Sequence, residues 1–361
     1  MLREIIQAPE DKTYLSQFMT ELPFNCLFDK GRTGCGGTTI AIENNIDTII
    51  AMPYVNMIKN KTEQHSNLLG VYQGVTETEI LDHIHNNQII KIAVTYDKLD
   101  FLIGLLQAKG INPYKDYFLL VDEWHILFNS YAFRNEAVRK VLFHSRKFDR
   151  VTYMTATPIE DEFILEELQN LPIKEIIWKN TIKLNIKPVI TSNPINKVCQ
   201  LIDDAINGRM FGNLHFFVNS VEFIADSIKK AGLKPEQVRI ICSNNISQGK
   251  GHKSNQKKLG DSFIIATTTD EVKHINFYTS TCFEGCDIYD ENGRTYIVSD
   301  KNKSHTLLDI STLIIQICGR IRNSLYKSDI CHIHTETRYN QFISLDEFKA
   351  YSEKQIQETK S

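Results

Sequence analysis

The glycine-rich stretch Gly31-Arg32-Thr33-Gly34-Cys35-Gly36-Gly37-Thr38-Thr39 constrains the fold more than any other part of this sequence. It follows an apolar run, residues 23–28, that is typical of a buried strand, and residues 38–44 after it are typical of the start of a helix. Glycines permit positive φ angles and let successive backbone N–H groups converge on an anion. A strand, such a loop and a helix in this order predict a phosphate-binding loop, with the helix N-terminus facing the anion. A flexible turn in some other α/β protein is the alternative.

One position of this loop departs from the phosphate-binding pattern. The pattern is glycine, four residues, glycine, lysine and then serine or threonine; Gly31, Gly36 and Thr38 match it, but Gly37 stands where the lysine is expected. The residues expected to contact nucleotide are Gly31, Arg32, Thr33, Gly34, Cys35, Gly36, Gly37, Thr38 and Thr39. The missing ammonium normally bridges the β- and γ-phosphates. We expect Lys30 or Arg32 to replace it, or hydrolysis to be slow.

Length and pattern predict an α/β protein of two domains. A chain of 361 residues with 42% hydrophobic and 24% charged residues can bury two cores. Strand-length apolar runs alternate with amphipathic stretches, which is typical of mostly parallel sheets covered by helices. The expected strands are residues 23–28, 48–52, 90–94, 117–121 and 151–154 in the first half and 214–218, 238–242, 263–266, 275–278, 295–298 and 330–334 in the second, with a helix at 221–231.

The domain boundaries follow from where this alternation stops. Residues 173–194 lose periodicity and contain Pro188 and Pro194, which predicts the crossing between domains. We therefore expect a first domain at 1–175, the crossing at 176–195, a second domain at 196–343 and a polar tail at 344–361.

Composition excludes several classes of protein. The net charge of −3 excludes a globally basic nucleic-acid coat but permits a local cationic groove. The acidic N-terminus is not a secretory signal, and no apolar run approaches the roughly 20 residues of a membrane span. The eight cysteines include no Cys-x-x-Cys pair, which favours reduced thiols in a cytoplasm. A zinc site from Cys282, Cys286, Cys318 and a histidine is a less favoured alternative.

Two adjacent carboxylates mark the end of another apolar run. Asp122 and Glu123 follow residues 118–121, so a parallel strand would deliver both to the carboxyl edge of its sheet, where open α/β folds bind ligands. Asp122 is expected to hold Mg²⁺ through water beside the Thr38 hydroxyl. Glu123 is expected to orient the water that attacks the γ-phosphate of ATP.

The sequence Asp122-Glu123-Trp124-His125 resembles the Asp-Glu-x-His box of superfamily-two helicases and translocases, and further elements of that superfamily follow in order. The matching segments are 33–38 (motif I), 51–54 with Lys59 (motif Ia), 94–97 (a Thr-Tyr element), 155–158 (motif III), 216–220 (motif IV), 279–287 (motif V) and 316–322 (motif VI). The resemblance implies two RecA-like domains, with ATP in the cleft between them and single-stranded nucleic acid lying across both.

The resemblance also implies roles for residues of the second half. Gln316 would contact the γ-phosphate or the attacking water, and Gly285 and Asp287 would line the cleft. An arginine would reach the γ-phosphate when the cleft closes. We expect Arg320 in this role and keep Arg322 as its alternate, because the second arginine of motif VI usually follows the first by three residues and here it follows by two.

Nucleic-acid contacts are implied by the same resemblance. The expected residues are Pro53, Lys59, Thr95, Tyr96, Asn219, Ser243 and Thr279. Residues 248–259 include four lysines and His252, which would grip a phosphate backbone or form a solvated loop.

These features together predict a nucleic-acid-dependent ATPase acting as a helicase or translocase on single-stranded nucleic acid, DNA more than RNA, with replication or recombination proteins as partners. In its compact size and its composition rich in Ile, Asn and Lys, the chain resembles the short helicase-like proteins of tailed bacteriophages, which implies a bacterial or phage-infected cytoplasm. The alternative is a helicase-like scaffold that binds nucleic acid without efficient hydrolysis. A restriction-system motor would need an additional nuclease domain.

Overall fold

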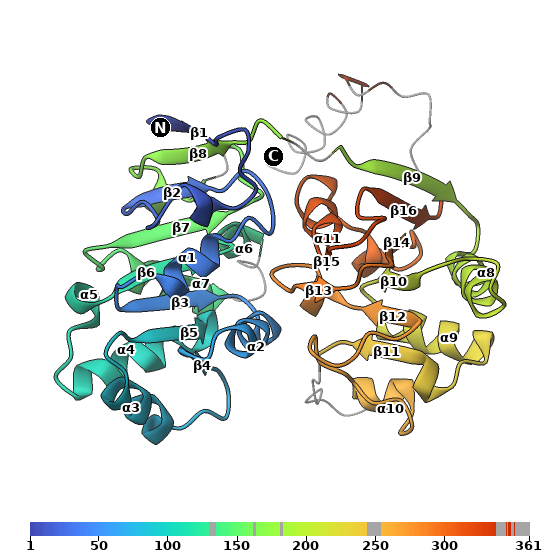
Figure 1. Ribbon diagram of the computed structural model, residues 1–361, viewed down its shortest axis with the longest axis horizontal. Coiled ribbons are helices and arrows are strands. Elements are labelled where there is room, and N and C mark those ends of the chain that lie inside the picture. Colours follow the sequence, from blue (N-terminus) through green and yellow to red (C-terminus); the bar gives the residue numbers. More distant parts are fainter. Residues whose placement is uncertain are drawn as a thin grey trace, which may run out of the picture.

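The chain forms two α/β lobes that lie side by side (Figure 1). The computed structural model describes residues 1–129, 135–161, 164–180, 183–243 and 254–336, together with 344, 346, 347 and 350. Each lobe is built on its own parallel sheet, and the chain passes from the first sheet to the second between β8 (Ile173–Ile177) and β9 (Asn185–Ile190). The predicted fold class, two α/β domains with mostly parallel sheets, is confirmed.

The first lobe has an eight-stranded sheet in the order β1-β8-β2-β7-β6-β3-β5-β4. Its strands are β1 (Arg3–Gln7), β2 (Cys26–Asp29), β3 (Thr48–Met52), β4 (Leu68–Val71), β5 (Lys91–Thr95), β6 (Phe118–Asp122), β7 (Val151–Thr155) and β8. Its helices are α1 (Gly37–Glu43), α2 (Val55–Gln64), α3 (Glu77–Asn86), α4 (Leu99–Ala108), α5 (Pro113–Asp116), α6 (His125–Asn129) and α7 (Asn135–Ser145). Every residue of β3, β5, β6 and β7 is buried, as expected for a parallel sheet covered on both faces.

The second lobe has a six-stranded sheet in the order β11-β12-β10-β14-β16-β9. Its strands are β9, β10 (Asn213–Phe217), β11 (Val238–Ile241), β12 (Ile275–Tyr278), β14 (Gly293–Ser299) and β16 (Asp329–His334), and β13 (Ile288–Tyr289) pairs separately with β15 (Ile321–Arg322). Its helices are α8 (Pro194–Ile206), α9 (Val221–Ala231), α10 (Asn255–Leu259) and α11 (Ile315–Cys318). The elements α11, β13 and β15 lie on the side of this lobe that faces the first (Figure 1).

The segment expected to cross between the domains contains strands at both ends. Residues 173–177 form β8, which pairs in parallel with β1 and β2, and residues 185–190 form β9, which pairs in parallel with β16. Pro188 is tolerated because β9 is an edge strand, where the missing N–H breaks no ladder between two neighbours.

Other expectations for the second half meet different outcomes. The strand expected at 263–266 is reduced to a single bridge between Ile240 and Ile265, and Ile264 is 80% exposed. The lysine-rich segment 248–259 falls outside the described residues up to 253, and only its end forms α10. Most of the expected tail, residues 344–361, also lies outside the described residues.

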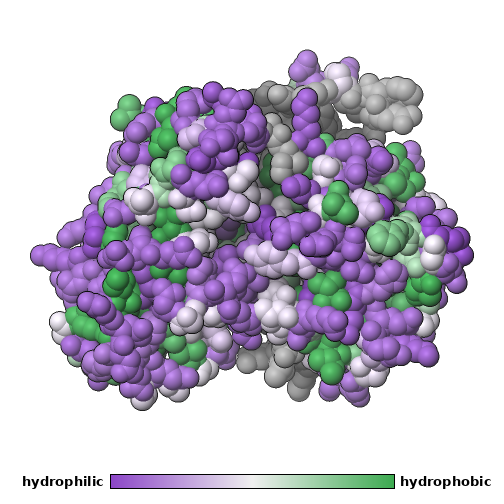
Figure 2. All heavy atoms as spheres, viewed as in Figure 1, coloured by the Kyte–Doolittle hydropathy of each residue, from purple (hydrophilic) through white to green (hydrophobic). Residues whose placement is uncertain are grey.

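Apolar packing joins the two lobes as well as filling each of them. A cluster of buried residues extends from the loop and α2 of the first lobe, including Met57, to Phe283 and Ile317 of the second. Where Gly285 approaches α2, a Cβ atom would overlap the side chain of Met57. On the face shown in Figure 2 hydrophilic side chains predominate and the apolar ones form separate small patches. Among the described residues, no helix is long and apolar enough to span a membrane.

Candidate nucleotide-binding site

A cavity of about 290 Å³ lies between the two lobes. Most of the predicted site residues line it: Gly34, Cys35, Gly36, Gly37, Thr38, Thr39, Asp122, Glu123, Gly285, Asp287, Arg320 and Arg322. Gly31, Arg32, Thr33 and Gln316 are not among the lining residues, although Gln316 contacts one of them. The volume is near the lower end of the usual range of small-molecule sites, about 300–1,000 Å³.

The glycine loop joins β2 to α1 as predicted, and its glycines are needed for its shape. Gly31, Gly34 and Gly36 have φ angles of 72°, 67° and 83°. A Cβ atom on Gly31 would overlap the carbonyl oxygen of Ile176, and one on Gly34 would overlap the guanidinium of Arg322. The positive φ angles thus disfavour a side chain at all three positions, and at Gly31 the backbone of Ile176 leaves no space for one.

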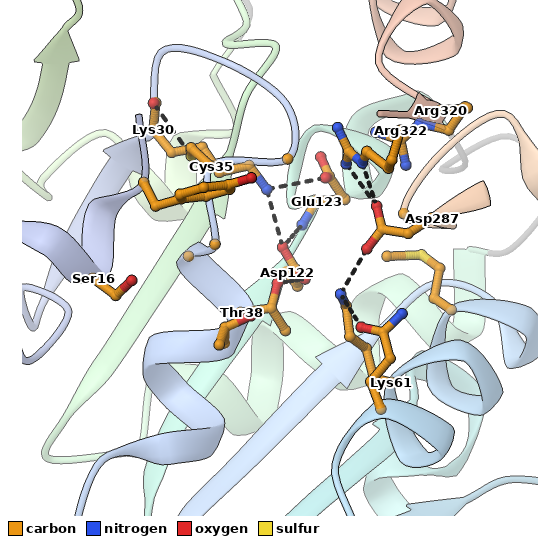
Figure 3. Close-up of a pocket in the computed structure, with 18 of the residues that line it drawn as sticks. Ser16, Lys30, Cys35, Thr38, Lys61, Asp122, Glu123, Asp287, Arg320 and Arg322 are labelled. Atoms are coloured by element: carbon orange, nitrogen blue, oxygen red, sulfur yellow. Dashed lines mark hydrogen bonds and ion pairs between the residues drawn. The ribbon is translucent and has the colours of Figure 1, made fainter. Parts of the chain in front are cut away.

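Four polar groups of the first lobe meet beneath this loop (Figure 3). The Thr38 hydroxyl donates to Asp122 Oδ2 over 2.8 Å. The Lys30 ammonium lies 3.2 Å from Glu123 Oε1 and 3.7 Å from Asp122 Oδ1. All four side chains are buried. Burial by itself lowers the pKa of Lys30, but the charges of Glu123 and Asp122 outweigh it and raise that pKa above its ordinary value.

Glu123 has a backbone conformation that is unusual for its residue type. Its φ angle is 53°, in the left-handed region, directly after the end of β6. Non-glycine residues in this region are uncommon and are concentrated at functional sites, where the surroundings hold them. Here the hydroxyl of Tyr96 accounts for part of that restraint, since it donates to the carbonyl oxygen of Asp122 over 2.7 Å.

Two polar contacts connect the surroundings of these carboxylates to the second lobe. The amide of Gln316 donates to Glu123 Oε2 over 3.2 Å and to the Thr157 hydroxyl over 3.3 Å. The His125 imidazole lies 2.9 Å from Glu284 Oε1 through its Nε2 and 2.8 Å from the Thr155 hydroxyl through its Nδ1. Burial lowers the pKa of His125, but the hydrogen bond to Glu284 and its charge outweigh burial and raise the pKa.

The two arginines expected at the γ-phosphate have different surroundings. Arg320 is 2% exposed, and its guanidinium donates to Gln316 O over 2.8 Å, Gln316 Oε1 over 3.2 Å and Cys286 O over 3.1 Å. All of these acceptors belong to its own lobe. Arg322 is less buried, and its guanidinium lies against Gly34 of the first lobe's loop.

Asp287 links Arg322 to a lysine that the sequence did not single out. Arg322 Nε and Nη2 donate to Asp287 Oδ1 over 2.8 Å and 2.6 Å, while Lys61 Nζ of α2 donates to Asp287 Oδ2 over 3.0 Å. Burial raises the pKa of Asp287, but the charges of Lys61 and Arg322 outweigh it and leave the pKa well below its usual range. Asp287 thus joins cations of both lobes at the edge of the cavity.

The two cations considered as replacements for the missing lysine, Lys30 and Arg32, point in different directions. Lys30 points into the cavity, as described above. Arg32 turns away from it: its guanidinium lies 3.9 Å above the ring of Trp178 and donates to the backbone carbonyl oxygens of Thr13 and Asn180.

The residues expected to hold Mg²⁺ have suitable chemistry. Thr38 and Asp122 present a hydroxyl and a carboxylate side by side, which are hard oxygen ligands, and Mg²⁺ on nucleotides is typically held by one or two such groups plus phosphates and water. When bound there, the ion would offset phosphate charge. Within the described residues no group of three or more His, Cys, Asp or Glu side chains forms a metal cluster, so Cys282, Cys286 and Cys318 do not form a zinc site.

Sequence reasoning missed two tyrosines at the cavity. Tyr14 of the first lobe and Tyr289 of the second both line it, and they are 52% and 58% exposed. Tyr14 precedes a single 3₁₀ turn, Leu15–Gln17, and no motif marks it. Tyr289 lies two residues after Asp287 in β13, and only the pairing of β13 with β15 brings it to the cavity.

The residues expected to touch nucleic acid divide by exposure. Lys59, Asn219 and Ser243 are partly exposed. Pro53, Thr95, Tyr96 and Thr279 are buried. The Tyr96 hydroxyl donates to the backbone carbonyl oxygens of Asp122 and Glu123, beneath the carboxylates.

Comparison with known proteins gives a fold but no family assignment from sequence. No family model matches the sequence, and no curated protein matches it either. Among solved structures, Mss116p bound to single-stranded RNA and AMP-PNP aligns with a TM-score of 0.60 and 13% identity, over 91% of this chain and 69% of that one. Dbp5 of S. cerevisiae bound to RNA and ADP BeF3 aligns with a TM-score of 0.56 and 12% identity, over 92% and 83%.

A third likeness comes from a DNA-bound protein. The helicase Lhr of Mycobacterium smegmatis, bound to single-stranded DNA and AMP-PNP, aligns with a TM-score of 0.55 and 12% identity, over 86% of this chain and 44% of that one. At such identities the likeness concerns the fold. The chain therefore has two RecA-like lobes in tandem, the fold of these structural neighbours, as was predicted.

Proposed function

We propose that this chain is a nucleic-acid-dependent ATPase that acts as a helicase or translocase, hydrolysing ATP in the cleft between its lobes. One observation carries the proposal: Glu123 of the first lobe, which lines the cavity with the glycine loop and has a left-handed backbone, accepts a hydrogen bond from Gln316 of the second lobe. A general base whose position depends on both lobes ties hydrolysis to lobe closure.

The roles of individual groups follow from their positions. Glu123 orients and polarises the attacking water, and Gln316 holds Glu123. Thr38 and Asp122 hold the metal that accompanies ATP. The remaining charge near the γ-phosphate comes from an arginine of the second lobe, and the structure supports Arg322 over Arg320 for this role, because Arg322 reaches the loop of the first lobe.

The nucleobase of ATP has a place between the lobes. Tyr14 and Tyr289 come to the cavity from opposite sides of the cleft and expose about half of their surface. Stacking between aromatic rings holds a planar base without reading its edge. We propose that these two tyrosines hold the base of ATP.

Single-stranded nucleic acid is the proposed second ligand. The structural neighbours include proteins bound to RNA and a protein bound to DNA, so they support a nucleic-acid partner of either kind. Lys59, Asn219 and Ser243, being accessible, are the remaining candidates for contact with its phosphates.

The test is phosphate release from ATP with and without single-stranded DNA or RNA. The proposal expects stimulation by one or both and its loss in Glu123→Gln, which keeps the hydrogen-bonding shape but cannot act as a base. DNA is the nucleic acid that we expect, and the same assay with matched DNA and RNA oligonucleotides tests this expectation. Equal, unstimulated rates in the parent and Glu123→Gln would contradict the proposal.

A scaffold function is the second candidate, and Gly37 is the observation that favours it, since it lacks the usual phosphate-bridging charge. That function predicts binding of nucleic acid without any stimulated turnover. The same experiment therefore separates the two functions.

A further inference from the structure

We infer that the Lys30 ammonium holds the polyphosphate of the bound nucleotide. In other phosphate-binding loops this role belongs to the lysine that stands where this chain has Gly37. The inference rests on the proposed function, because it names a cation of the same site. It assigns that cation to the end of the strand before the loop, whereas the usual pattern places it at the start of the helix after the loop.

The position of the Lys30 ammonium is the first support. Nζ is directed into the cavity beneath the loop, 3.2 Å from Glu123 Oε1 and 3.7 Å from Asp122 Oδ1 (Figure 3). Asp122 and the Thr38 hydroxyl next to it are the groups expected beside the terminal phosphates. The ammonium therefore already lies where phosphate oxygens would meet these carboxylates.

The backbone of Lys30 is held on both sides, which fixes where its side chain can reach. Its N–H donates to the carbonyl oxygen of Thr155 in β7 over 2.9 Å. Its carbonyl oxygen accepts from Trp178 Nε1 over 2.8 Å. Trp178 and Thr155 are themselves buried. The side chain of Lys30 therefore starts from a fixed point at the end of β2, and its ammonium ends beside Glu123 and Asp122 under the loop.

The packing around Gly37 is the second support. A Cβ atom at this position would lie 2.5 Å from Met154 Sδ and 3.1 Å from Met154 Cε, closer than side chains approach. Met154 lies in β7, beside β2, and is completely buried. The start of α1 is therefore packed against the sheet in a way that suits glycine, and a lysine there would displace Met154.

The other cations of the first lobe's cavity wall and loop are committed elsewhere. Arg32 is stacked on Trp178 outside the cavity. Lys61 is bound to Asp287 of the second lobe. Among the described residues of the first lobe that line the cavity, Lys30 and Lys61 are the cations, and Lys30 is the one that faces Asp122 and Glu123.

Its chemistry allows Lys30 to hold a phosphate without releasing Glu123. An ammonium has three N–H donors, and among the described residues that of Lys30 forms one hydrogen bond, to Glu123 Oε1. A phosphate oxygen can accept from another. The same charge offsets the two buried carboxylates, which would otherwise repel the anion.

The experiment compares nucleotide binding and turnover in Lys30→Met, which keeps the length of the stem and removes the charge. Calorimetry with AMP-PNP is done once with Mg²⁺ and once in EDTA. We expect an affinity loss of about 10- to 100-fold in both buffers, the effect of one charge-assisted hydrogen bond. Stimulated phosphate release should fall about 100-fold or more.

Two further substitutions serve as comparisons. Lys179→Met removes an ammonium of the first lobe that is 58% exposed and pairs with Glu10, and it should match the parent. Arg32→Met tests the rival cation and should cost much less affinity than Lys30→Met. If Lys30→Met is too unstable to measure, the double variant Lys30→Gln with Glu123→Gln replaces the ion pair by two neutral amides, and its affinity should still be reduced relative to Glu123→Gln alone.

Several results would overturn the inference. Unchanged AMP-PNP affinity in Lys30→Met would do so, and so would a loss seen only with Mg²⁺, because Lys30 would then act merely by positioning Asp122. Binding by the parent that vanishes in EDTA would show that the ammonium does not hold phosphate by itself. A parent that binds no nucleotide in either buffer overturns the proposed function as well, whereas a parent that hydrolyses ATP beside an equally active Lys30→Met overturns this inference alone.

Discussion

The two neighbouring arginines of the second lobe should fail in different ways when their charges are removed. Arg320 is buried with three hydrogen bonds to Gln316 and Cys286. Arg320→Met removes the donor to Cys286 O and Gln316 Oε1, whereas Gln316 O keeps the N–H of Gly319. We expect it to lower the free energy of unfolding by about 3–5 kcal/mol, since each buried acceptor that loses its donor costs about 1–3 kcal/mol. Arg322 is partly exposed, and Asp287 keeps Lys61 as its partner, so Arg322→Met should cost no more than about 1 kcal/mol.

Turnover should separate the two variants in the opposite way: relative to the stability that each variant loses, Arg322→Met should lose more turnover than Arg320→Met. If Arg322 is the group that stabilises charge on the γ-phosphate, Arg322→Met should reduce nucleic-acid-stimulated phosphate release about 1,000-fold or more while its unfolding midpoint stays near that of the parent. The assays are thermal unfolding and steady-state phosphate release at saturating ATP and nucleic acid.

Arg294→Met is the matched control for these variants. The Arg294 guanidinium stacks 3.7 Å above the ring of Tyr326 in the same lobe and does not line the cavity, so its loss should leave turnover unchanged. The reasoning is refuted if Arg322→Met turns over like the parent, or if Arg320→Met loses turnover without any loss of stability, because the original choice of Arg320 as the γ-phosphate contact would then be right.

Three other predictions concern stability, its dependence on pH, and binding of the nucleobase. Lys91 is buried, and its ammonium donates to Ala41 O, Asn44 Oδ1, Ile46 O and Thr48 Oγ1. Lys91→Met should lower the free energy of unfolding in urea by about 2–4 kcal/mol, because these oxygens lose a charged donor. The raised pKa of His125 means that its contact with Glu284 adds stability that is complete below about pH 6.5 and is lost as pH rises through the folded-state pKa. The unfolding midpoint of Glu284→Gln should therefore fall less steeply than that of the parent from pH 6 to pH 9. Tyr289→Ala should weaken AMP-PNP binding about 10-fold and leave competition by inorganic tripolyphosphate unchanged, since it removes base stacking alone.

The strands that could be predicted from sequence are those buried on both faces. β3 was predicted with its observed bounds, and β5, β6 and β7 were predicted within a residue or so, because continuous apolar runs leave few alternatives. The edge strands β1 and β9 were missed. Five or six residues with most side chains exposed have no clear pattern, and Pro188 made β9 resemble a loop.

The site could be predicted as far as its local segments allowed. The glycine loop and Asp122-Glu123 lie within single strand-to-loop junctions, so sequence order was enough to place them at one sheet edge. Which cation reaches the phosphates was left open between Lys30 and Arg32, because the choice depends on Trp178, a distant residue that stacks on Arg32 and binds the carbonyl oxygen of Lys30. No local pattern contains that information.

The choice between Arg320 and Arg322 depended on the register of a two-residue strand. β15 pairs with β13, and Asn323, directly after it, has a φ angle of 59°. This pairing turns Arg322 toward the first lobe and leaves Arg320 within its own. A motif that counts residues along a helix could not anticipate a change to strand and left-handed backbone at this point.

The two proposed phosphate cations differ in what they require from the rest of the molecule. Lys30 is held entirely by the first lobe, through β7, Trp178 and Glu123, so it can act on phosphate whatever the position of the second lobe. Arg322 reaches the loop only while the second lobe lies against the first. A chain built in this way should capture nucleotide with the first lobe alone and accelerate its cleavage only on closure, and closure is the step that nucleic acid lying across both lobes would favour. Moving the lysine from α1 to the end of β2 preserves this division, because both positions belong to the first lobe.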